Sequence, residues 1–161
     1  MFSRILLATD FSEQAEQAYP WAARLAVSNK GKVILMHALE DDLVATAPVF
    51  ANYMAPGALD LGNYRAEFRA GARKALESAA DKLRALGAEV EVLLVEIGKP
   101  SHAIVTTAKE TSASVIVIST HGRGGLAHLL LGSTAERVVR MASVPVLTVH
   151  EGDLARAGGD E

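Results

Sequence analysis

Short apolar runs alternate with longer amphipathic segments along most of this chain. The apolar runs are rich in Val, Ile and Leu and have polar or turn residues on either side, as strands buried on both faces of a sheet do. Parallel strands of that kind need helical crossovers, and a helical pattern separates each run from the next. The alternation therefore predicts one α/β domain of doubly wound, Rossmann-like type, with helices on both faces of a five-stranded parallel sheet. The predicted strands are Ile5–Ala8, Lys32–Ala38, Ala88–Val95, Ser114–Ser119 and Val144–Val149.

Turn and capping residues indicate where the helices begin and end. Ser12 is placed to cap the first helix, and Pro20 predicts a kink or a restart within it. The longest helical pattern spans residues 63–86 and ends at Gly87, which suits the C′ position. A further helix is expected to begin near Pro100. The predicted apolar face of the longest helix comprises Phe68, Ala72, Ala75, Leu76, Ala79, Leu83 and Leu86.

Composition narrows the class of protein. Half of the 161 residues are apolar, which is enough for one sizeable core, and the net charge is −3 with no block of Lys and Arg. This charge pattern argues against nucleic acid or an anionic membrane as a partner. The chain has no cysteine, and its five histidines show no spacing with acidic residues that suits a metal site. The apolar runs are too short for a signal peptide or a membrane span, so we expect a cytoplasmic protein.

The connection between the fourth predicted strand and the last helix is rich in glycine. It spans residues 119–134 and includes Gly122 and Gly132. A glycine-rich turn that enters a helix N-terminus presents backbone N–H groups and the positive end of a helix dipole to one place, where phosphate groups bind. The connection therefore predicts a nucleotide site. The sequence Ser133–Glu136 also has the form of a capping box, which is an alternative role for the Ser133 hydroxyl.

This connection resembles the nucleotide-binding signature of the universal stress protein family. The signature consists of a glycine, two residues, a second glycine, nine residues, and a third glycine followed by Ser or Thr. Gly122 and Gly132-Ser133 match it in type and spacing, and Ser119 stands in the place of the first glycine. The resemblance covers residues 1–150, which we expect to form the nucleotide-binding domain, with residues 151–161 as a flexible tail.

The resemblance implies a strand order of 3-2-1-4-5, whereas periodicity alone leaves the order 2-1-3-4-5 open. In the implied order Asp10 and the Gly122 turn face one crevice, at the carboxyl ends of neighbouring strands. The ligand implied is ATP, together with any Mg²⁺ that the nucleotide carries. Asp10 would accept from a ribose hydroxyl or an adenine amine; on the residues alone, a turn or capping role with Ser12 has equal weight. The nucleotide-binding residues so implied are Ala8, Thr9, Asp10, Ala38, Ser119, Gly122, Arg123, Gly132, Ser133 and Thr134.

The function implied is that of an ATP-binding stress-response or regulatory module, which acts through nucleotide-dependent conformation and dimerisation. Two alternatives stay open, a slow ATP hydrolase or phosphoryl-transfer enzyme and a dimeric interaction module without nucleotide. No lysine precedes Ser133 as in a Walker motif, and we assign no catalytic residue. The apolar edge strand Val144–Val149 predicts a homodimer. The irregular excursion over residues 40–62 is either a lid or contact surface or a variable insertion.

Overall fold

The computed structural model of this chain describes four stretches, residues 1–39, 61–96, 98–120 and 132–150. These stretches contain all five predicted strands and most residues of the predicted site. The predictions for Gly122, for Arg123 and for the tail at residues 151–161 lie outside the described residues. The excursion lies outside them too, except for its last two residues.

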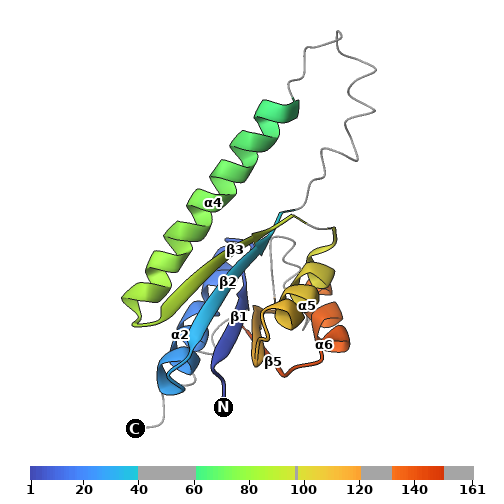
Figure 1. Ribbon diagram of the computed structural model, residues 1–161. Helices are drawn as coiled ribbons and strands as arrows, with labels where there is room; N and C mark the ends of the chain where they lie inside the picture. Colours follow the sequence, from blue (N-terminus) through green and yellow to red (C-terminus); the bar gives the residue numbers. More distant parts are fainter. Residues whose placement is uncertain (40–60, 97, 121–131, 151–161) are drawn as a thin grey trace.

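The five strands form one sheet in the order β3-β2-β1-β4-β5, and its pairs are parallel (Figure 1). This confirms the α/β class and the strand order that the family resemblance implied, and it excludes the alternative order. β3 and β5 are the two edge strands, as predicted. The strand bounds are β1 Arg4–Ala8, β2 Lys32–Ala38, β3 Glu89–Val95, β4 Val115–Ser119 and β5 Val146–Val149.

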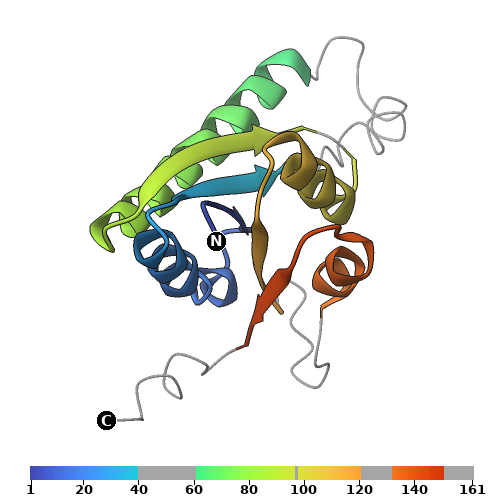
Figure 2. The same ribbon diagram turned by 60° about the horizontal axis from the view of Figure 1, so that its bottom comes forward.

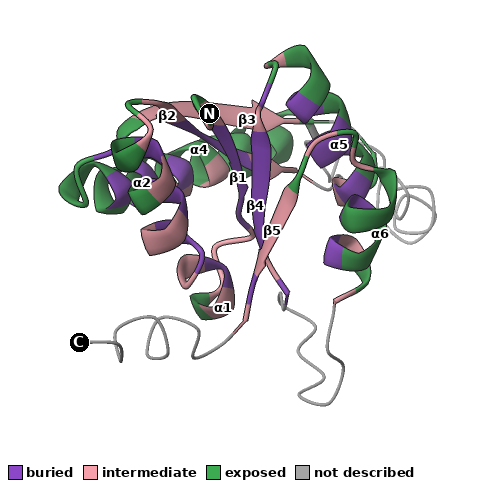
Figure 3. Ribbon diagram, turned by 90° about the horizontal axis from the view of Figure 1, so that it is seen from below, coloured by how far each residue is buried: buried purple, intermediate pink, exposed green. Residues whose placement is uncertain are grey.

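β1 lies at the centre of the sheet, and its side chains alternate between two hydrophobic cores. Ile5 and Leu7 belong to one buried cluster, whereas Leu6 and Ala8 belong to the other. Helices α2 and α4 cover the first cluster, and α5 and α6 cover the second (Figure 2). A strand buried on both faces needs apolar side chains at its buried positions, and β1 is apolar from Ile5 to Ala8. Figure 3 shows β1 as buried along most of its length. The helix bounds are α1 Glu13–Glu16, α2 Tyr19–Ser28, α4 Leu61–Ala85, α5 Pro100–Glu110 and α6 Ser133–Met141.

The helix cap, the helix restart and the C′ glycine occur at the predicted residues. The Ser12 hydroxyl accepts a hydrogen bond from the Ala15 N–H at 3.1 Å and caps α1. The helical segment restarts at its proline, because Pro20 lies in the first turn of α2, where a missing N–H removes no helical bond. Gly87 has a φ of 86° just after α4, the left-handed conformation predicted for C′.

The predicted core face of α4 is correct only where the helix lies over the sheet. Leu76 and Leu83 are fully buried, but Phe68, in the first half of α4, is 48% exposed; Leu86, which is 49% exposed, lies just past the end of the helix. The 25 residues of α4 extend about 37 Å, whereas the seven residues of β3 extend about 23 Å. The first turns of α4 therefore project beyond the sheet (Figure 1). Within the described ranges, none of the helices combines the length and hydropathy of a bilayer-spanning helix.

The turn between α2 and β2 generates a prediction about stability. A Cβ on Gly31 would lie 2.6 Å from the Ser3 carbonyl oxygen and 2.8 Å from that of Phe2, both of which are backbone atoms. We expect Gly31→Ala to lower the free energy of unfolding by about 1–3 kcal/mol in urea titrations, because backbone must shift. The matched control is Gly71→Ala, since Gly71 is helical and a Cβ there meets nothing within 4 Å. This control is expected to stabilise the fold by about 0.5–1 kcal/mol; equal effects of the two substitutions would contradict the account.

Candidate functional site

The described residues of the predicted site gather at the carboxyl edge of the sheet. Ala8, Ala38 and Ser119 end β1, β2 and β4, which are consecutive neighbours. The Gly132 N–H donates to the Thr120 carbonyl at 2.6 Å, and this bond brings the start of α6 to the end of β4. The edge therefore combines three strand ends, the turn after β1 and the N-terminus of α6. Crevices in this position bind ligands in open α/β sheets.

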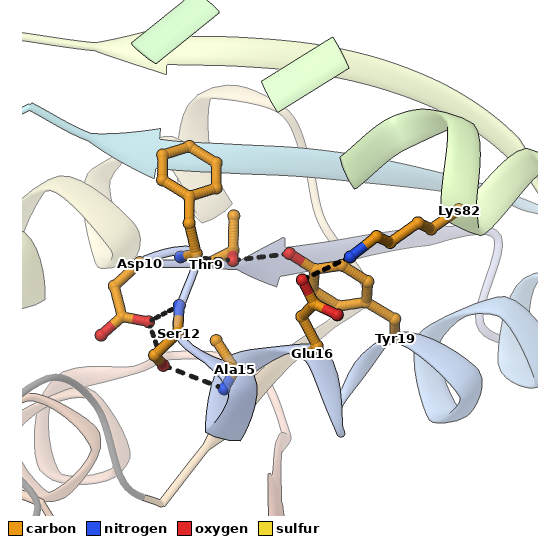
Figure 4. A network of polar contacts seen from close by, with 8 residues as sticks. Thr9, Asp10, Ser12, Ala15, Glu16, Tyr19 and Lys82 are labelled. Carbon is orange, nitrogen blue, oxygen red and sulfur yellow. Dashed lines mark hydrogen bonds and ion pairs between the residues drawn. The ribbon is translucent and has the colours of Figure 1, made fainter. Parts of the chain in front are cut away.

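Asp10 directly follows β1 and is held by the residue that caps α1. Its Oδ1 accepts from the Ser12 N–H at 3.0 Å and from the Ser12 hydroxyl at 2.6 Å (Figure 4). The same hydroxyl oxygen accepts from the Ala15 N–H, so the turn and the helix cap form one chain of hydrogen bonds. The turn role considered for Asp10 is thus confirmed. The bonds also fix where the carboxylate lies at the edge of the sheet.

Thr9 links β1 to the helices and to the neighbouring strand. It is 6% exposed; its N–H donates to the Met36 carbonyl at 3.0 Å, and its Oγ1 accepts from the Phe11 N–H at 3.1 Å. Its hydroxyl also shares a hydrogen bond of 2.8 Å with the Tyr19 hydroxyl (Figure 4). The buried Thr9 side chain therefore stabilises the turn after β1 through its hydrogen bonds. Burial raises the pKa of the Tyr19 phenol, the hydrogen bond to Thr9 lowers it in part, and the carboxylates of Glu16 and Asp10 raise it further.

Phe11 has a backbone conformation that is uncommon for an aromatic residue. Its φ is 64°, in the left-handed region, which costs an L-residue roughly 1–2 kcal/mol. Its ring packs against the His37 ring with centroids 4.4 Å apart and planes at 37°. Aromatic pairs of this kind contribute about 0.5–1.5 kcal/mol, an amount comparable to the strain. The His37 Nδ1 lies 2.8 Å from the Thr9 carbonyl oxygen, which can only accept, so Nδ1 donates.

Thr120 directly follows β4 and contacts the end of β5 and the start of α6. It is 1% exposed, and its N–H donates to the Val149 carbonyl at 2.9 Å. Its hydroxyl lies 3.3 Å from the same carbonyl oxygen and 3.1 Å from the His150 Nδ1. With the bond from Gly132 to its own carbonyl, Thr120 connects the ends of β4 and β5 to the start of α6.

The sequence-based account of the α6 cap was wrong in one respect. The N-cap is Gly132, with extended dihedrals of φ −67° and ψ 153°, and Ser133 is the first helical residue. Ser133 therefore forms no capping box. The Glu136 N–H donates to the Gly132 carbonyl at 2.9 Å, and the Glu136 carboxylate pairs with Arg140 at 2.5 Å instead. Within the described residues no side chain caps α6, so the Ser133 hydroxyl has no capping role at the helix start.

Sequence reasoning did not identify Tyr19, His37 or Thr120 as parts of the site. One feature of the sequence could have identified His37: it is the single polar side chain within the apolar run Val33–Ala38, and it lies near the carboxyl end of the strand. Thr120 lay within the glycine-rich connection but outside the signature positions. In the ranges that the structure covers, no three His, Asp or Glu side chains come together as metal ligands would.

Comparison with known proteins identifies a family that has this fold and shows which ligands some of its members bind. The profile of the universal stress protein family matches residues 1–150 of this chain. The structure of MJ0577, a universal stress protein of Methanocaldococcus jannaschii, is 30% identical with a TM-score of 0.75 over 94% of this chain and 97% of that one.

Two similar structures contain an adenine nucleotide. One is a universal stress protein in complex with cAMP, 27% identical with a TM-score of 0.64, over 92% of this chain and 97% of that one. The other is the universal stress protein of Archaeoglobus fulgidus in complex with dAMP, 27% identical with a TM-score of 0.63 over the same shares of the two chains. Adenine nucleotides therefore bind to relatives that share this fold.

The raised pKa of Tyr19 predicts a specific pH dependence of stability. Its cause, burial, favours the neutral phenol in the folded chain, so the contribution to stability is complete below the unfolded pKa of about 10 and is lost as pH rises through the folded pKa. Tyr19→Phe should cost about 0.5–1.5 kcal/mol at neutral pH and should remove this part of the alkaline decline. Urea titrations of both proteins from pH 8 upward would measure the difference.

Tyr64→Phe is the matched control, because it removes a hydroxyl from a side chain that is 44% exposed. It should change the free energy of unfolding little at neutral pH. An alkaline decline of the same slope in wild type and Tyr19→Phe would contradict the assignment.

Proposed function

The chain belongs to the universal stress protein family, and on this premise we propose that it is an ATP-binding regulatory module of the stress response. ATP would bind in the crevice at the carboxyl edge, with Mg²⁺ carried by its phosphates. Binding of ATP would change the conformation of the turns at this edge and the contacts between two copies of the chain. The single observation that carries the proposal is the parallel pairing of β1 with β4, which places the Asp10 turn and the start of α6 on neighbouring strands.

The two sides of this crevice suit the two ends of a nucleotide. The Asp10 carboxylate would repel a triphosphate, so it is assigned to the ribose or the adenine amine. Ala8 and Ala38 end their strands beside it and would line the adenine pocket. On the other side, no side chain of the described residues caps the first turn of α6, and the N–H groups and helix dipole there favour an anion.

The remaining assigned residues divide in the same way. Thr9 supports the adenosine side, while Ser119 ends β4, the strand that precedes α6 in the chain. The phosphate side comprises Gly122, Arg123, Gly132, Ser133 and Thr134, the first two of which are assigned from the sequence. A helix dipole alone contributes about 0.3–1 kcal/mol toward an anion, so several N–H groups must act together.

Calorimetric titration with ATP and Mg²⁺ tests the proposal. We expect a Kd on the order of micromolar, or about −8 kcal/mol. Gly122→Val should weaken binding by about tenfold or more, because a branched side chain would stand between the phosphates and the backbone N–H groups. Gly71→Ala on the exposed part of α4 is the control and should leave the Kd unchanged. No heat and no thermal stabilisation at millimolar ATP would refute the proposal.

Phosphate release from the same samples separates ATP hydrolysis from pure binding. A regulatory module should release little inorganic phosphate during the titration. Sustained release that is lost in Gly122→Val would instead support the slow ATP hydrolase.

We also propose that two copies pair through β5. This strand is an edge of the sheet, and its side chains at Val146, Leu147 and Thr148 are only partly buried. The Ile116 N–H donates to the Pro145 carbonyl, and the Thr120 N–H donates to the Val149 carbonyl. Backbone groups of successive residues in a strand point alternately to its two sides, so the odd-numbered residues of β5 face β4 and the N–H and C=O of Thr148 point away from it. Such outward groups can extend a sheet across two chains.

Thr148→Pro tests this pairing. The substitution removes an outward N–H while the bonds from β4 remain, so the fold should persist and the dimer should dissociate. Light scattering coupled to gel filtration measures the mass, and circular dichroism checks the fold. A monomeric wild type, or a dimer that survives the substitution unchanged, would contradict pairing through β5.

A further inference from the structure

The turn after β1 contains one strained residue, and it directly follows Asp10. Phe11 has a φ of 64°, and a bulky residue in the left-handed region is an outlier that persists only where its surroundings hold it. Of the non-glycine residues with positive φ in the described stretches, it is the one at the proposed site: Lys30 and Ser112 lie in turns before β2 and β4, at the opposite edge of the sheet.

His37 contacts the chain on both sides of Asp10. Its Nδ1 donates to the carbonyl of Thr9, the preceding residue, at 2.8 Å. Its ring packs against Phe11, the following residue, at a centroid distance of 4.4 Å. These two contacts join β2 to the turn after β1, across 26 to 28 residues of sequence. A side chain that holds both neighbours of a residue also determines where that residue's side chain lies.

We propose that His37 is a positioning residue for the adenosine side of the site. By holding Thr9 and Phe11 it keeps the turn in its strained conformation, and the Asp10 carboxylate stays at the edge of the sheet, bound by Ser12. His37 acts through Asp10 and not by contact with the nucleotide. This inference rests on the proposed function, since it assigns Asp10 to the nucleoside end of the ligand.

The position of His37 in its strand supports a role in the site. The four preceding residues of β2, Val33 to Met36, are aliphatic and fully buried, as a central strand requires. Polarity begins at His37, where β2 reaches the carboxyl edge, and the side chain is half-buried there. Core packing alone would be served by another aliphatic residue, which could neither donate to Thr9 nor stack on Phe11.

The test is a double-mutant cycle on the full chain with AMP as the ligand. His37→Asn keeps a donor near the position of Nδ1 and removes the ring, so AMP binding should weaken about tenfold, equivalent to about 1.4 kcal/mol. In the Asp10→Ala background the same substitution should cause no further loss, because its effect passes through the carboxylate. His102→Asn, on the exposed surface of α5, is the matched control and should leave AMP affinity unchanged.

Two results of the cycle would overturn the inference. An unchanged Kd in His37→Asn would show that the ring is not needed. Losses that multiply in the Asp10→Ala background would show that His37 acts independently of Asp10, for example by touching the nucleotide itself.

A second readout needs no ligand. A residue with positive φ has its amide and α protons unusually close, so Phe11 should give a strong intraresidue NOE in the wild type. The NOE should weaken in His37→Asn and persist in His37→Phe, which keeps a ring against Phe11. An unchanged NOE in His37→Asn would overturn the inference even if no nucleotide binds, whereas failure of the wild type to bind AMP or ATP would overturn the proposed function.

Discussion

The central position of β1, which pairs on one side with β2 and on the other with β4, determines where the polar groups of this fold can lie. Its backbone is bonded along both edges and its side chains are buried on both faces, so polar groups can gather only where the strand ends. That end is the turn at Thr9 and Asp10. Because β4 ends at the same edge, the start of α6 is brought there too. One strand thus determines both sides of the proposed crevice.

The polar groups at this end form a connected set, and the set accounts for a costly backbone conformation. Thr9 bonds to β2 through its N–H, to Tyr19 and Phe11 through its hydroxyl, and to His37 through its carbonyl. Each neutral hydrogen bond contributes about 0.5–1.5 kcal/mol net, so together they can offset a left-handed Phe11. Strain held in this way is characteristic of turns that must present one side chain in one place. Here that side chain is the carboxylate of Asp10.

Much of the fold was predictable because it depends on local pattern, and the details of the site were not because they depend on contacts distant in sequence. Short runs rich in apolar residues located the strands, and Pro20 located the restart of the helix. The strand order required the family resemblance, since periodicity permits two orders. The exposure of Phe68 could not be read from helical spacing, because it follows from the length of α4 relative to β3. Local backbone preferences do not predict a left-handed conformation for Phe11, because its contact with His37 joins residues 26 positions apart in the sequence.

We propose that an adenine nucleotide binds at the carboxyl edge of the sheet, between the turn after β1 and the start of α6. A titration of the ¹⁵N-labelled chain with AMP, followed through the backbone amide signals, would locate the bound nucleotide. We expect shifts at Asp10, Ser12, Ser133 and Thr134, and none at Gly31 or Ser114 on the opposite edge. Shifts confined to that opposite edge, or none at millimolar AMP, would contradict the proposal.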